Sequence, residues 1–125
     1  MFLGYEMVVV DVDKKALERM KYDIYPSRYG AWSDKIIQYQ IEEEPRCEYN
    51  LICIGTPPDT HLNILLNSLS DYKGKTLLEK PLCEPTNQAI KKLNQLTKSN
   101  SDNIYVGYNH VISKANRIVK NIKKK

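Results

Sequence analysis

Short apolar runs alternate along the chain with stretches whose apolar residues recur at helical spacing, and this alternation leaves few folds open. The first run, Glu6–Asp11, is rich in β-branched residues; Asp13 follows as a helix N-cap, and Lys14–Met20 reads as a helix. Leu51–Thr56 is a continuous apolar run, which predicts a strand buried on both faces of a parallel sheet. Strands alternating with helices favour right-handed crossovers and a parallel sheet covered by helices.

Two more such units follow in the second half. Leu62, Leu65, Leu66 and Leu69 recur at helical spacing, and Lys75–Glu79 predicts a short strand that ends before Pro81. Thr86 caps a predicted helix, Ile104–Tyr108 predicts another strand, and a last amphipathic helix carries Val111, Ala115, Ile118 and Ile122.

The segment between the first two strands is less regular. Tyr22–Gly30 holds Pro26, Ser27 and Gly30 and reads as a connection that could contain a small strand. Ser33 then caps a predicted helix that buries Ile36 and Ile37. Glu42–Arg46 is expected to be a solvated loop.

Composition predicts one soluble, cytoplasmic domain over residues 1–125. The chain is 42% hydrophobic and 27% charged, with neither an apolar run long enough to cross a membrane nor a signal peptide. Cys47, Cys53 and Cys83 match no zinc or redox spacing, so we expect reduced thiols and no metal site. The net charge of +4 comes from a lysine-rich C-terminal tail, and no aromatic stacking pattern accompanies it, which argues against a nucleic-acid partner.

Polar residues stand where the predicted strands end, which is where open parallel sheets bind ligands. The Asp11 carboxylate could accept both ribose hydroxyls of an adenosine, although a helix-capping aspartate is the better explanation for this residue alone. In Gly55–His61, two prolines fix a turn, the glycine permits close backbone approach and the Thr56 hydroxyl could face a ligand; a stiff turn without a ligand explains the pattern equally well.

The third and fourth strand ends carry further candidates. Lys80, within Glu79–Pro81, places an ammonium group at the ligand edge as a proton donor or cofactor anchor; the alternative is a solvated lysine. Asn109 and His110 offer an amide and an imidazole, with no carboxylate partner in view.

Together and in this order, these segments resemble the Gfo/Idh/MocA family of oxidoreductases, related to glucose-fructose oxidoreductase and inositol dehydrogenase. The resemblance rests on VVVDVD at Val8–Asp13, IGTPPDTH at Ile54–His61, LEKPL at Leu78–Leu82 and VGYN at Val106–Asn109. It implies that Asp11 binds the adenosine ribose and that Thr56, Pro57 and Pro58 pack along the cofactor. It further implies that Glu79 and Lys80 lie near the nicotinamide, with Lys80 as the catalytic residue beside the reacting carbon, and it adds His61 and Asn109 to the cofactor-binding set.

Members of such a family move a hydride between NAD or NADP and a sugar or polyol carbon, which makes a nicotinamide dinucleotide the expected partner. Asp11 has no neighbouring arginine, which favours NAD, although Lys14 and Lys15 could meet a phosphate.

The departures from the family pattern lie at the two ends. A GxGxxG turn, which would set the pyrophosphate on a helix N-terminus, occurs nowhere in these 125 residues, and we expect the substrate domain of the family to be absent. The expected fold class is α/β, a partial Rossmann-type doubly wound parallel sheet lacking its first βα unit. The missing strand would lie between those ending at Asp11 and Thr56, so two inner edges would be unpaired.

Two hypotheses follow. The chain is a fragment of such an oxidoreductase with little or no activity alone. Alternatively, it is a non-catalytic remnant that associates with a full-length homologous subunit or with a chain supplying the first strand.

Overall fold

A computed structural model describes residues 5–71, 74–100 and 102–107. The chain divides into two compact units, Met1–Arg46 and Cys47–Lys125. Each contains its own parallel sheet, with two strands in the first unit and three in the second. No helix among these residues is long and apolar enough to cross a bilayer.

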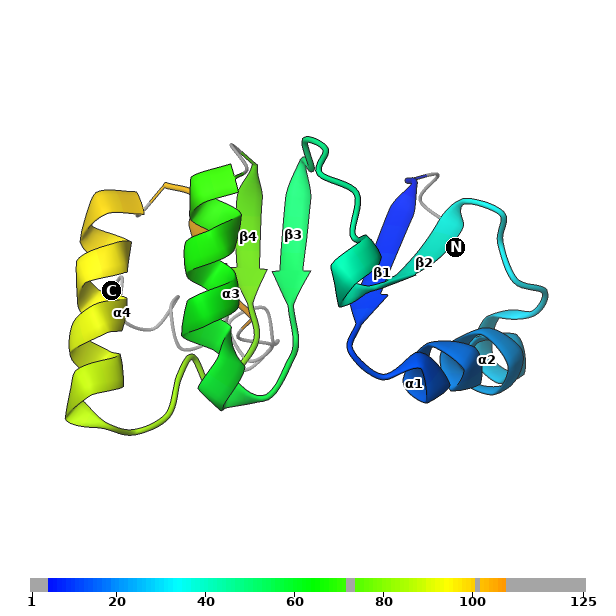
Figure 1. Ribbon diagram of the computed structural model, residues 1–125, viewed down its shortest axis with the longest axis horizontal. Helices are drawn as coiled ribbons and strands as arrows, with labels where there is room; N and C mark the ends of the chain where they lie inside the picture. The colour runs from blue at the N-terminus through cyan, green and yellow to red at the C-terminus, as the bar shows by residue number, and fades with distance from the viewer. Residues whose placement is uncertain (1–4, 72–73, 101, 108–125) are drawn as a thin grey trace, which may run out of the picture. The chain divides into compact units, whose positions relative to one another are not determined.

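The first unit contains two parallel strands that pair with each other, and a helical segment connects them (Figure 1). Strand β1 (Met7–Asp11) leads into α1 (Lys14–Arg19), a π-helical turn (Met20–Ile24) and α2 (Tyr25–Tyr29). Strand β2 (Ile36–Gln40) follows, and a 3₁₀ turn (Ile41–Glu43) comes directly after it. Asp13 caps α1 as predicted, because its carboxylate accepts the Lys15 N–H at 2.9 Å. The Gln38 side chain donates to the Leu17 carbonyl at 2.9 Å and ties α1 to β2.

Two predictions for this unit were wrong. Ile36–Gln40 is a strand rather than a helix: Ile36 is 5% exposed and Ile37 is 50% exposed, and this alternation is the strand period. Much of Tyr22–Gly30 is helical rather than a connection. Pro26 stands near the start of α2, where a proline is tolerated, and Gly30 ends the helix with φ at 86°.

The second unit is a three-stranded parallel sheet in the order β3-β4-β5. Its elements are β3 (Leu51–Ile54), α3 (Pro58–Asp71), β4 (Lys75–Leu78), α4 (Asn87–Asn100) and β5 (Ile104–Val106). Thr86 caps α4 as predicted, its hydroxyl accepting the Ala89 N–H at 3.2 Å. The parallel pairing and the α/β class, a partial Rossmann-type fold, are confirmed.

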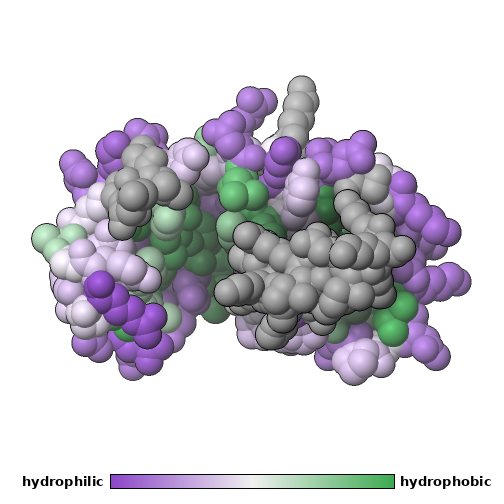
Figure 2. All heavy atoms as spheres, turned by 180° about the vertical axis from the view of Figure 1, so that it is seen from behind, coloured by the Kyte–Doolittle hydropathy of each residue, from purple (hydrophilic) through white to green (hydrophobic). Residues whose placement is uncertain are grey.

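Among the described residues, the core cluster of this unit lies on one face of the sheet. Ile54 and Leu78 pack with Leu65 of α3, and Leu93 and Leu96 of α4 pack against this cluster. Leu51 is 55% exposed and Cys53 is also exposed, so the prediction that both faces of β3 are buried was wrong for the described part of the chain. Figure 2 shows apolar surface on the side turned away from the viewer in Figure 1. The predicted last helix, at 111–122, lies outside the described residues.

Candidate functional site

The carboxyl ends of β3, β4 and β5 stand in one row. Ile54 lies opposite Leu78, and Leu78 opposite Val106. The pairing continues one residue further, because Glu79 donates its N–H to the Ile54 carbonyl and Gly107 donates to the Leu78 carbonyl, each at 2.9 Å. Gly55, Glu79 and Gly107 are therefore neighbours at the edge of the sheet where ligands bind in folds of this class.

Hydrogen bonds from two residues of α3 hold the turn after β3. His61, one turn into α3, is 1% exposed, and its Nε2 lies 2.6 Å from the Thr56 carbonyl. A carbonyl can only accept, so Nε2 carries the proton, whereas the buried Nδ1 has no hydrogen-bond partner among the residues described. The Thr60 hydroxyl lies 2.7 Å from that of Thr56 and 2.8 Å from the Pro57 carbonyl. These contacts fix Thr56 and Pro57 while leaving both exposed.

Glu79 lies between two glycines. A Cβ atom at position 107 would be 2.7 Å from its Oε1 and 2.9 Å from its Oε2, so the carboxylate occupies the space that a side chain there would need. On the other side, a Cβ at position 55 would meet only the Glu79 Cγ, at 4.0 Å, an ordinary contact. The carboxylate is thus turned toward β5, and the backbone of Gly55 stays open.

The Glu79 carboxylate also affects the pKa of a thiol on the neighbouring strand β3. Partial burial raises the pKa of the Cys53 thiol, and the negative charge of Glu79 raises it further. Cys53 lies on β3 two residues before Gly55, which directly follows the strand, so the two share the face of the sheet that α3 and α4 do not cover.

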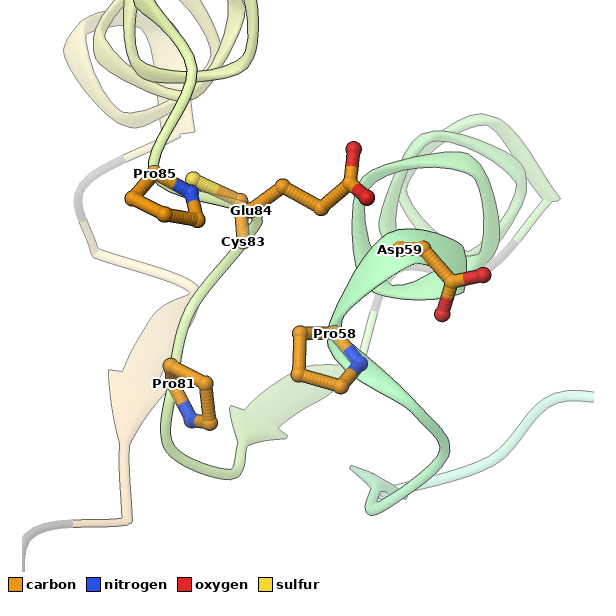
Figure 3. Close-up of a pocket in the computed structure, with 6 residues that line it drawn as sticks. All are labelled: Pro58, Asp59, Pro81, Cys83, Glu84 and Pro85. Carbon is orange, nitrogen blue, oxygen red and sulfur yellow. The ribbon is translucent and has the colours of Figure 1, made fainter.

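A pocket of 430 Å³ opens between the start of α3 and the connection from β4 to α4 (Figure 3). Prolines from both segments line it, so it is mainly apolar; its lining residues are Pro58, Asp59, Pro81, Cys83, Glu84 and Pro85. Of the predicted cofactor contacts, it contains Pro58 alone.

The remaining predicted residues are spread over both units. Lys80 is exposed at the end of β4, and its peptide bond to Pro81 is cis. Asp11 ends β1 in the first unit, where its Oδ1 accepts the Asp13 N–H at 2.9 Å, an interaction typical of a local turn. Asn109 lies outside the described residues. The part of the chain that is described holds no cluster of metal-ligating side chains.

Reasoning from the sequence missed Gly107 and Cys53 as members of this site. Gly107 stands in the VGYN segment, but nothing in the sequence tells that a side chain there would meet the carboxylate of Glu79. That contact depends on the register between β4 and β5.

Residues 7–108 match the model of the GFO_IDH_MocA family, described as an oxidoreductase family with an NAD-binding Rossmann fold. No curated protein and no solved structure matches significantly. Since the family match covers most of the chain, this protein belongs to the Gfo/Idh/MocA family of NAD-binding oxidoreductases.

Proposed function

We propose that this chain binds a nicotinamide dinucleotide, NAD in preference to NADP, as part of an oxidoreductase acting on a sugar or polyol. The observation that carries this proposal is the row of strand ends at Gly55, Glu79 and Gly107, in a chain of an NAD-binding family. An open glycine backbone beside a rigid turn suits the close approach of a flat, extended ligand.

Within the second unit, Thr56, Pro57 and Pro58 would pack along the cofactor, and Glu79 and Lys80 would stand near its nicotinamide. Asn109 is a further proposed cofactor contact. His61 supports this set from beneath, since its hydrogen bond fixes the carbonyl of Thr56. In the first unit, the second carboxylate oxygen of Asp11 would accept ribose hydroxyls while Oδ1 keeps its bond to Asp13.

The cofactor supplies the hydride chemistry when it is bound, and the protein supplies binding and proton handling. The Lys80 ammonium would donate a proton to the substrate oxygen when the carbonyl is reduced, and the neutral Lys80 amine would accept the proton of the hydroxyl when it is oxidised. The 125 residues should show little or no turnover alone, because the sequence contains no glycine-rich loop for the pyrophosphate.

Calorimetric titration of the purified chain with NADH and NADPH, up to millimolar concentration, tests this function. We expect Asp11→Ala and Lys80→Ala each to weaken binding about tenfold, the loss that follows from one charge-assisted hydrogen bond. Exposed residues of matching type, Glu18→Ala on α1 and Lys91→Ala on α4, serve as controls and should leave affinity unchanged. A folded chain that binds neither nucleotide would contradict the proposal.

A second candidate function is association with a homologous full-length subunit. Strand β3 is paired with β4 on one side only, and no described strand occupies its other side. Parallel strands are normally buried within a larger sheet, so this edge is a template for another strand. Co-purification with a full-length family member would support association, whereas a stable monomer that ignores such a subunit would exclude it.

A further inference from the structure

We infer that Gly107 is a positioning residue: its missing side chain leaves room for the Glu79 carboxylate at the end of β5, and so keeps that carboxylate away from the Gly55 backbone. The family match and the proposed function assign Gly107 no such role. The consequence for ligand binding rests on the proposed function, but the placement of the carboxylate can be tested without any cofactor.

The geometry is asymmetric about Glu79. On the β5 side, its carboxylate carbon and both oxygens lie within 2.9 Å of where a Cβ of residue 107 would stand. On the β3 side, its nearest atom to a Cβ of residue 55 is the methylene Cγ, at 4.0 Å. A side chain on residue 107 would therefore push the carboxylate back across β4, toward Gly55 and Cys53.

Such a push is sterically cheap for the fold. The atoms in the way are the far end of one flexible side chain, and Gly107 does not have the positive φ that an L side chain resists. Gly107→Ala should therefore fold normally and move one charge. This distinguishes it from glycines whose replacement meets backbone atoms.

The thiol of Cys53 reports where that charge lies. Because the Glu79 charge already raises the pKa of Cys53, moving the carboxylate toward β3 should raise the pKa further. Removing the carboxylate in Glu79→Ala should lower it. The two substitutions thus shift the same thiol in opposite directions, which a general loosening of the structure would not do.

The first experiment measures the rate of Cys53 alkylation by iodoacetamide against pH, with the modified cysteine identified by mass spectrometry. The variants are Gly107→Ala, Glu79→Ala and the double variant in the full chain. We expect opposite pKa shifts in the single variants and no effect of Gly107→Ala once Glu79 is alanine. A lowered or unchanged pKa in Gly107→Ala, or the same shift in the absence of Glu79, would overturn the inference.

The second experiment repeats the NADH titration with the same variants. A carboxylate pushed over Gly55 competes with the dinucleotide for space and repels the negative charge of its phosphates, so Gly107→Ala should weaken NADH binding by about fivefold. In the Glu79→Ala background, it should have no further effect. Failure of every variant and of the wild type to bind NADH would contradict the proposed function, whereas the alkylation result would still decide the role of Gly107.

Discussion

At the scale of single residues, His61 joins the turn after β3 to the core. Its ring is almost completely buried, and its Nε2 donates to the Thr56 carbonyl at 2.6 Å. Replacing His61 with alanine removes the packed ring atoms and leaves the Thr56 carbonyl without this hydrogen-bond donor. We expect His61→Ala to lower the free energy of unfolding by about 2–4 kcal/mol.

The measurement is the unfolding midpoint in urea, followed by circular dichroism. Asn67→Ala is the matched control, because Asn67 lies on the same helix with an exposed side chain and should change stability by about 0.5 kcal/mol or less. Equal midpoints for the two variants would show that the buried ring contributes nothing to the turn.

The sequence predicted which residues lie at the ends of β3 and β4, but not that His61 is buried. Thr56, Pro57, Glu79 and Lys80 were placed at strand ends because an apolar run followed by proline marks such an end in one dimension. The burial of His61 was not predicted, because it depends on which face of α3 meets the sheet in three dimensions.

At the scale of elements, the sequence located each described strand of the second unit and misassigned β2. The strands β3, β4 and β5 end where the predicted ones do, within two residues. Ile36 and Ile37 are adjacent, and two neighbouring apolar residues fit a helix as well as a strand. The pairing of this segment with β1, which makes it a strand, is not visible in the sequence. The crossover before it was missed because Pro26 usually marks a break, and here it stands near a helix start.

Gly74 directly precedes β4, where two backbone segments approach each other closely. A Cβ there would overlap the Tyr49 carbonyl oxygen and lie 3.0 Å from that of Asn50. Neither atom can yield cheaply, because Asn50 also accepts the Lys75 N–H at 3.1 Å and so starts the β3–β4 pairing. Gly74→Ala should therefore cost about 1–3 kcal/mol of stability.

Gly55→Ala is the control for this prediction, because a Cβ at position 55 meets nothing closer than 4.0 Å. Gly55→Ala should change the thermal unfolding midpoint little. A shift as large as that of Gly74→Ala would mean that both positions need glycine for its backbone conformation, and not because another backbone segment lies close to Gly74.

At the scale of the whole molecule, the two units differ in how many described apolar side chains they bury. Among the described residues of the first unit, Leu17 and Ile36 are the buried apolar side chains, while Met7 and Ile37 are about half exposed. The second unit buries Ile54, Leu62, Leu65 and Leu78. Local opening costs least where the fewest apolar contacts are lost, so the first unit should open more easily.

Hydrogen exchange measures this difference directly. The central strand β4 is paired on both sides: Thr76 donates to the Asn103 carbonyl at 2.7 Å, and Glu79 to that of Ile54. We expect amides of β4 to exchange most slowly and those of β1 much faster, even though both are strands of parallel sheets. Equal protection of β1 and β4 would mean that β1 pairs with a further strand besides β2, on the edge that no described strand occupies. That strand could come from a homologous full-length subunit or from a second copy of this chain. Exchange measured with and without the full-length subunit would distinguish these two sources.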